Sequence, residues 1–513
     1  MDKKNKKLVI IVSCLIAVIG ITFAYFIAQS NKGASGKVNV GGDSLDELTF
    51  NVSKDISLSI DQFNFASGAG NLSDQATATA SLKANSTKNT ASYNYNVYFY
   101  ISSNNYVYTT SDNKPEIVLT ITDPTGAEVK SIDGLTYYDS ITNADGVSIS
   151  GFDITTQKGL LNVALDYAIT SNSSSYATSQ NWKVTITFIN LATNQLDNQN
   201  KNLDAKIFIQ QGDFTPTLAD YVKSQFTTQG DKNLYFHDST LENGAGDNSY
   251  RYAGSSDTTN NFVCFGADAS TCPTDNLYRI IGVFDDQVKL IKYDYAKSSL
   301  LGTDGDYINT YSGTTLSGTN KGENTKEEIG AYCWNCSNGS TSTNTWSSSR
   351  LNKTNLNTNF ISNIGTTWAN KIATHTWIVG GNTLANIGTE VAPTVYKNEI
   401  TSPATDTKYT AKIGLMYASD YGYSASPSAW EITIDYYDDS SVTSANWMYM
   451  GLLEWMISPL TDSSVNALYI FYNGDVGPIR VNGNDAVRPV FYLDSSVKYI
   501  SGEGTQSSPM IIE

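Results

Sequence analysis

Residues 93–100 have the sequence Tyr-Asn-Tyr-Asn-Val-Tyr-Phe-Tyr, and this stretch decides the fold of the first half of the chain. Large side chains recur at every second position, at Tyr93, Tyr95, Val97 and Phe99. A period of two is typical of a β-strand that buries one of its faces. We therefore expect a strand here, with one face in a hydrophobic core.

Similar strands are expected on both sides of this stretch. Ile117, Leu119 and Ile121 alternate with polar residues and end at the turn-forming sequence Asp-Pro-Thr-Gly of residues 123–126. Residues 182–188 and 206–209 have the same character. Several short strands separated by turns predict an all-β sandwich, which we assign to residues 45–211.

The second half of the chain has a more varied pattern. A short amphipathic helix is predicted within residues 212–232, which also hold a linker, and a mixed α+β domain is predicted over 233–513. In this domain, residues 277–283 and 288–292 predict a hairpin, and Asn473-Gly474 marks a second one. Helical spacing appears around 347–375. We therefore expect an α+β protein overall.

An uncharged, apolar run extends from Leu8 to Ala28, directly after four lysines within residues 3–7. Such a run is long enough to cross a bilayer as a helix, and the lysines favour the cytoplasmic side. The prediction is a membrane anchor or signal segment at 1–30, a linker at 31–44, and a single-pass cell-membrane protein with an extracellular body. If the segment is a signal peptide, which is the alternative, the protein is secreted.

The charge of the chain bears on its partners. Lys and Arg number 33 against 50 Asp and Glu, which gives a formal net charge of −17. An acidic surface repels phosphate backbones, so nucleic acid is not an expected partner.

Four cysteines form two close pairs, Cys264 with Cys272 and Cys333 with Cys336. Outside the membrane such pairs are first interpreted as disulfides. Four thiolates also suit zinc, and the two-residue spacing of the second pair also suits redox chemistry. These alternatives stay open at the level of the sequence.

Catalytic patterns are sparse. The chain has two histidines, His237 and His375, and no nucleophile, phosphate-loop or dinucleotide-binding motif. The acids Asp435, Asp438, Asp439 and Glu454 leave a glycosidase-like pair open, and we expect no enzyme. We expect no cofactor, with calcium as the alternative through oxygen ligands at 304–306 and 435–439.

Aromatic residues in loop-rich sequence are the strongest candidates for ligand contacts. Flat rings beside Asn and Asp are suited to the C–H faces and hydroxyls of sugars. The alternative for each ring is a place in the core. The candidate ligand-binding residues are Trp368, Trp377, Tyr421, Tyr423 and Trp430.

Four segments occur in an order that resembles a known family. They are 455–459 (Trp-Met-Ile-Ser-Pro), 467–470, 473–476 (Asn-Gly-Asp-Val) and 487–490 (Val-Arg-Pro-Val). Over about 230–513 the chain resembles C-type-lectin-like domains of Gram-positive surface proteins, including those that end some collagen-like adhesins. The resemblance implies ligand-carrying loops and structural roles for Trp455 and Arg488, with the Arg488 guanidinium bound to backbone carbonyls. The Glu-Pro-Asn and Trp-Asn-Asp motifs of calcium-dependent sugar-binding lectins are missing.

The first part of the chain resembles camelysin and TasA-like fibre proteins. This likeness rests on the sequence Thr-Phe-Ala-Tyr-Phe at 22–26, followed by a β-domain. The resulting hypothesis is a cell-surface protein with a sandwich stalk and an adhesin-like head that binds an extracellular ligand, such as a glycan or a host or matrix protein. A biofilm-matrix or fibre subunit is the first alternative, and an exported hydrolase is the second.

Overall fold

The chain forms two compact units, Met1–Phe214 and Thr215–Glu513, in a computed structural model. The residues described are 46–61, 70–84, 91–172, 175–191, 193–268, 271–315, 321–336 and 342–513, together with the backbone of 35–40. Each unit has its own hydrophobic core. Helix α2 (Leu218–Gln225) belongs to the second unit.

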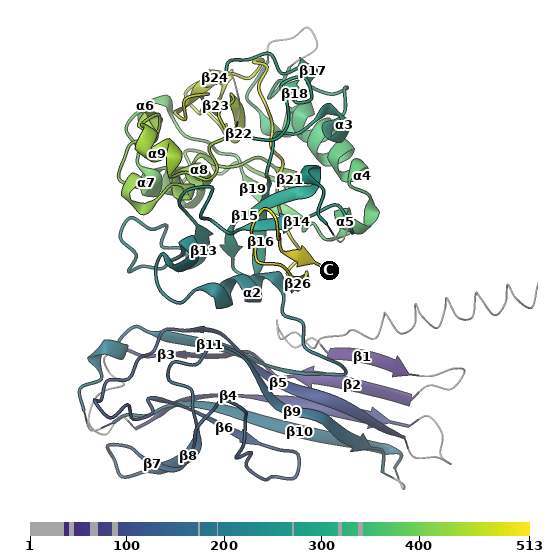
Figure 1. Cartoon of the computed structure of the whole chain (residues 1–513), viewed down its shortest axis with the longest axis vertical. Helices are drawn as coiled ribbons and strands as arrows, with labels where there is room; N and C mark the ends of the chain where they lie inside the picture. The colour runs from purple at the N-terminus through teal and green to yellow at the C-terminus, as the bar shows by residue number, and fades with distance from the viewer. Residues whose placement is uncertain are drawn as a thin grey trace, which may run out of the picture. The chain divides into compact units, whose positions relative to one another are not determined.

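Two antiparallel sheets make up the described part of the first unit (Figure 1). One sheet has the strand order β1-β2-β4-β10-β6-β8-β7, and the other has the order β3-β11-β5-β9. The strands are β1 (Ser35–Val40), β2 (Asp46–Val52), β3 (Ile56–Ser59), β4 (Leu72–Lys83), β5 (Ser92–Asn104), β6 (Ile117–Thr122), β7 (Tyr137–Thr142), β8 (Ser148–Asp153), β9 (Gly159–Thr170), β10 (Ala177–Phe188) and β11 (Asn202–Gln210).

Alternating side chains explain how the two sheets pack. Trp182, Val184 and Ile186 of β10 are buried, while polar residues between them face outward. Leu119 and Ile121 of β6 lie opposite Ile186 and Val184 in the antiparallel register, so their side chains enter the same core. Burial of one face of each sheet produces a sandwich.

Strand β5 departs from the expected single buried face. Val97 and Phe99 enter the main core, as the alternation predicts. Tyr98 and Tyr100, on the opposite face, are also only 3% exposed because Phe214 packs against both rings, at centroid distances of 5.7 and 5.8 Å. Phe214, the last residue of the first unit, thus covers the face of β5 that the alternation predicted to be exposed.

The second unit is organised around an antiparallel sheet with the order β12-β13-β15-β16-β25-β21, with β14 paired to β15. Short pairs and one three-stranded sheet surround it. The strands are β12 (Leu234–His237), β13 (Ser249–Tyr252), β14 (Phe262–Cys264), β15 (Leu277–Phe284), β16 (Gln287–Lys292), β17 (Tyr307–Thr310), β18 (Gly330–Tyr332), β19 (His375–Ile378), β20 (Lys408–Ala411), β21 (Ile413–Gly414), β22 (Glu454–Pro459), β23 (Asn466–Ile470), β24 (Val476–Arg480), β25 (Val490–Tyr492), β26 (Tyr499–Ser501) and β27 (Ile511–Ile512).

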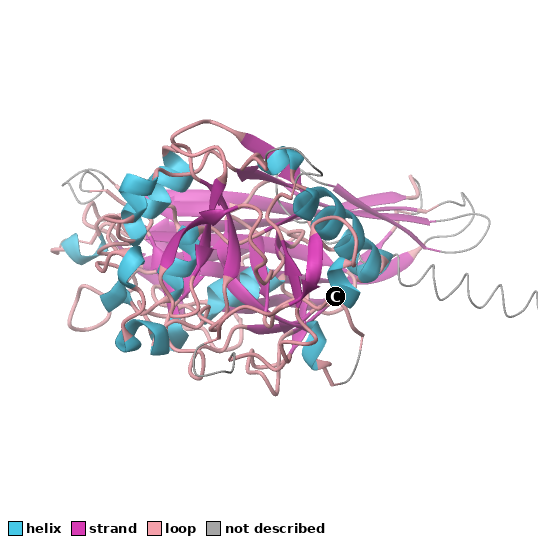
Figure 2. Cartoon of the chain, turned by 90° about the horizontal axis from the view of Figure 1, so that it is seen from above, coloured by secondary structure: helices cyan, strands magenta, loops and turns pink. Residues whose placement is uncertain are grey.

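The helices of this unit are short segments between strands and loops (Figure 2). Helix α2 begins where the Thr217 hydroxyl accepts a hydrogen bond from the Asp220 N–H at 3.0 Å. A π-helical segment at Leu351–Phe360 lies in the region of predicted helical spacing. The α-helices are α2, α3 (Ser298–Leu301), α4 (Ile361–Asn363), α5 (Thr366–Asn370), α6 (Leu384–Ile387), α7 (Ala392–Tyr396), α8 (Ala418–Ser424) and α9 (Ser440–Ser444).

The predicted α+β class for the whole chain is wrong. Of the described residues, 38% lie in strands and 17% are helical, and the strands pair antiparallel. Helical spacing misled because the longest helical stretch it marks, Leu351–Phe360 continued by α4, ends before Gly365, whose φ is +81°, and the α-helices that follow have seven residues or fewer. Such short pieces connect strands and form no layer of their own.

The single-pass membrane location also needs correction. Within the part of the chain that the structure describes, no helix is long and apolar enough to cross a membrane. The run from Leu8 to Ala28 and the camelysin-like segment 22–26 lie outside the described residues.

Candidate functional site

The five aromatic residues predicted to contact a ligand are all buried in the second unit. Their exposed fractions lie between 0% and 6%. Trp430 Nε1 donates to the Ala425 carbonyl at 2.9 Å, and Tyr421 Oη donates to the Gly474 carbonyl at 2.9 Å. A sugar needs an open ring face, so the structure does not support ligand stacking on Trp368, Trp377, Tyr421, Tyr423 or Trp430.

Both histidines pack against aromatic rings, His237 fully buried and His375 half-buried. His237 Nδ1 accepts a hydrogen bond from the Ala245 N–H at 3.1 Å. Burial lowers the pKa of His237 well below its ordinary value, and the Arg251 guanidinium lowers it further. His375 stacks on Tyr492, with ring centroids 3.9 Å apart, and burial lowers its pKa to about 4. Both imidazoles therefore act as neutral packing groups at neutral pH.

The acidic residues considered for metal binding or catalysis have different surroundings. Glu454 is buried and bound to Arg488, whereas Asp435 is partly buried and burial raises its pKa, helped by Asp438. Asp306 accepts the backbone N–H groups of residues 350 and 351. Among the described residues, no group of three or more His, Cys, Asp or Glu side chains could hold a metal ion.

The cysteine pairs are disulfides, and each closes a short loop. Cys264 is joined to Cys272, and Cys333 is joined to Cys336. The two bridges pin loops next to β14 and β18 of the second unit. Their presence fits the first interpretation of the sequence and not the zinc or dithiol alternatives.

Arg488 and Trp455 are each held by hydrogen bonds inside the second unit. Arg488 Nε and Nη2 contact the two carboxylate oxygens of Glu454 at 2.7 and 2.9 Å, and Nη2 also donates to the Met448 carbonyl at 2.7 Å. Trp455 Nε1 donates to the Tyr332 carbonyl at 2.7 Å. The expected carbonyl contact of Arg488 is present, but its main partner is a carboxylate that the resemblance did not predict.

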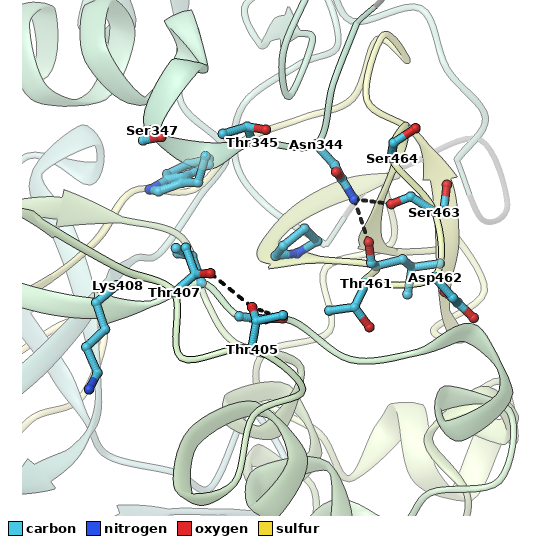
Figure 3. A pocket seen from close by; sticks show the side chains of 15 residues that line it. Asn344, Thr345, Ser347, Thr405, Thr407, Lys408, Thr461, Asp462, Ser463 and Ser464 are labelled. Atoms are coloured by element: carbon cyan, nitrogen blue, oxygen red, sulfur yellow. Dashed lines mark hydrogen bonds between the residues drawn. The ribbon is translucent and has the colours of Figure 1, made fainter.

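A surface hollow of about 530 Å³ offers a more accessible candidate site (Figure 3). Three segments that are distant in sequence form its walls, namely 344–347, 405–408 and 459–464, with Val379 and Gly380 between them. Figure 3 shows Thr405, Thr407 and Lys408 on one side and the 461–464 turn on the other. The volume is typical of small-molecule sites.

Close contacts between the segments hold the walls of this hollow in place. A Cβ added to Gly380 would lie 1.7 Å from the Thr405 carbonyl oxygen, so only glycine allows the strand end to approach the 405–408 segment. The Asn344 side-chain amide donates to the carbonyls of residues 460, 463 and 466 at 2.6 to 2.8 Å. This contact fixes the 459–464 turn against the 344–347 segment.

The chemistry of the hollow is mainly that of hydroxyl groups. Thr405 Oγ1 and Thr407 Oγ1 share a hydrogen bond of 2.9 Å, and other threonines and serines lie across from them. Lys408 pairs with Asp406 at 2.8 Å, and the Asp462 carboxylate accepts the Leu384 N–H at 3.1 Å. Among the described residues of the lining, the charged side chains are Lys408 and Asp462, and each has a partner.

A second hollow of about 660 Å³ lies between residues 255–262 and 443–450. It contains Lys321, whose Nζ lies 4.3 Å from the centroid of the Tyr449 ring, and the exposed Asp257. Its lining, like that of the 344–347 hollow, contains one acidic and one basic side chain. We use it below as an internal comparison.

Sequence reasoning missed the residues of the candidate hollow. The available signal was the serine, threonine and asparagine content of the loops near 302–345 and 381–410. Composition marks such loops as surface, but nothing local indicates that 405–408 meets 459–464.

The fold and the hollow define a two-unit, antiparallel β-rich protein with a hydroxyl-lined surface site. No protein-family model matches the chain, and a comparison with curated proteins also finds no match. The lectin-like and TasA-like resemblances therefore stay predictions.

Proposed function

We propose that this chain is an adhesin-like binding protein that takes a neutral saccharide in the hollow lined by 344–347, 405–408 and 459–464. The observation that carries the proposal is the concentration of exposed hydroxyl groups on two facing walls of a hollow of suitable size. Neutral hydroxyls form hydrogen bonds with sugar hydroxyls without the desolvation cost of a charge.

The test is binding of the full chain to a glycan panel, with calcium and with a chelator. The double variant Thr405→Val/Thr407→Val removes two hydroxyls at nearly unchanged volume, and we expect roughly tenfold weaker binding. The matched control is Thr376→Val/Thr410→Val, since these two hydroxyls pair at 3.3 Å on β19 and β20 but do not line the hollow.

Three results would contradict the proposal. Binding that survives the Thr405/Thr407 change but is lost in Tyr449→Ala would move the site to the second hollow. Equal loss in both double variants would indicate a folding effect rather than a contact. If the folded chain bound no glycan of the panel, the proposed glycan-binding function would be excluded.

A structural-subunit function is the second candidate, and strand β9 supports it. This strand is 12 residues long and lies at one edge of its sheet. Leu160 and Leu165 on it are 39% and 54% exposed. Long edge strands with exposed apolar residues pair with other chains. Concentration-dependent light scattering that is abolished by Leu165→Lys would favour this function.

A further inference from the structure

Lys289 and Asp420 form an ion pair deep inside the second unit. Lys289 lies on β16 and Asp420 on α8, 131 positions apart in the sequence. The Lys289 Nζ to Asp420 Oδ2 distance is 2.6 Å, and the two side chains are 1% and 2% exposed. An amine and a carboxyl group are thus held in contact in the absence of bulk water.

Aromatic rings enclose the amine. Lys289 Nζ lies 4.6 Å from the ring centroid of Tyr417 and 5.3 Å from that of Tyr492. The rings of Phe284 and Trp377 follow at 5.6 and 5.7 Å. An ionised pair in such surroundings is costly because both charges lose their hydration. A neutral covalent product would avoid that cost.

The surroundings also favour the nucleophilic form of the amine. Burial lowers the pKa of Lys289, although the Asp420 carboxylate opposes this, and the Arg251 guanidinium adds to the lowering. A lowered pKa increases the fraction of uncharged amine, which is the form that attacks a carboxyl carbon.

The carboxyl group is held in a fixed position. Asp420 Oδ2 also accepts the Tyr417 N–H at 2.9 Å, at the start of α8. The buried Glu399 carboxylate accepts the N–H groups of Ala418 and Ser419 at 3.1 and 3.0 Å, which fixes the first turn of the same helix. Reactants held in contact in this way avoid most of the entropic cost of an encounter.

We propose that Lys289 and Asp420 condense after folding to an intramolecular amide that links β16 to α8. The C–N bond forms between Lys289 Nζ and Asp420 Cγ, and the bond from Cγ to one carboxylate oxygen breaks. That oxygen leaves with two of the three ammonium protons as water, so no oxidant, reductant or co-reactant takes part. The cross-link closes a long loop and restricts the unfolded chain.

The decisive measurement is the intact mass of the full-length folded protein after denaturation and disulfide reduction. The expected mass is lower than that of the sequence by one water molecule. The Lys289→Arg and Asp420→Ala variants should each have the full mass of their own sequence, with no water lost. Asp420→Asn should react with loss of ammonia in place of water, which a structural role alone would not produce.

Peptide mapping locates the link and supplies an internal control. A branched peptide should join the segments around Lys289 and Asp420. Lys223 and Asp286 form a comparable pair at 2.9 Å, but with 17% and 35% exposure and without the aromatic enclosure, so they should stay unlinked. The full sequence mass in folded protein after prolonged incubation would overturn the proposal and leave an ion pair only.

Discussion

The sandwich unit and the second unit bury their strands in different ways. In β10 of the sandwich, apolar residues face the core and polar residues face outward. In β15 and β16 of the second unit almost every residue is buried, including Arg279, Lys289 and Lys292. A strand covered on both faces either lacks charges or provides each with partners. Lys289 pairs with a carboxylate, whereas Arg279 and Lys292 donate to neutral oxygen atoms. The second unit therefore depends on hydrogen-bonded buried charges, whereas the sandwich depends mainly on apolar contacts.

The largest expected effect comes from breaking a buried pair in the second unit. Glu454→Gln leaves the Arg488 charge without its carboxylate, and we expect a loss of about 3–5 kcal/mol. Hydrogen exchange on the full chain should show faster exchange throughout 215–513 and no change in 46–214. The control Asp406→Asn removes the partner of Lys408 in an exposed pair and should have no measurable effect. Equal destabilisation of both units would show that they unfold together.

The second-largest expected effect is a change with pH in the free energy of unfolding of the second unit. Burial raises the pKa of Asp485 from 3.8 to about 7, so the folded state binds a proton that the unfolded state has lost. The contribution of Asp485 to the free energy of unfolding is therefore complete below about pH 4 and declines by about 4 kcal/mol as the pH rises through 7. Asp485→Asn should reduce this decline and stabilise the second unit at pH 8.

Unfolding of the Asp485→Asn variant at pH 4 and pH 8 checks this prediction. The exposed residue Asp257 supplies the control Asp257→Asn, which should keep the pH dependence of the parent. A parallel pH dependence in Asp485→Asn and the parent would show that Asp485 is not responsible.

The smallest expected effect lies in the sandwich. Ile186→Val removes one methylene from a fully buried side chain, and we expect a loss of about 1 kcal/mol. Trp182 is the only tryptophan of the first unit, so tryptophan signals from the second unit should keep their midpoint. Val147→Ala, at a residue that is 54% exposed, should change neither unit. A shift of the second transition in Ile186→Val would contradict independent cores.

Local sequence predicted the strands of the sandwich best. The alternation in residues 117–121 and 182–188 reports directly on which side chains enter the core, because neighbouring side chains of a strand point to opposite faces. It gave no information on Tyr98 and Tyr100, since their cover is Phe214, more than a hundred residues away.

The candidate site was much less predictable. The aromatic residues chosen for ligand contact proved to be core residues, because residue type does not distinguish a buried ring from an exposed one in loop-rich sequence. Lys289 appears in sequence as an ordinary strand residue between Val288 and Leu290. Only the packing of α8 shows that a carboxylate reaches it.

The sequence by itself determined the β-character of the first unit and the turns between its strands, since these depend on neighbours within a few residues. The tertiary structure decided which aromatic rings are buried, how the buried charges pair and where the hydroxyl-lined hollow forms. Each of these depends on segments between about 30 and 130 residues apart, such as Asn344 with 460–466 or Lys289 with Asp420. Contacts at that range leave no local periodicity to detect.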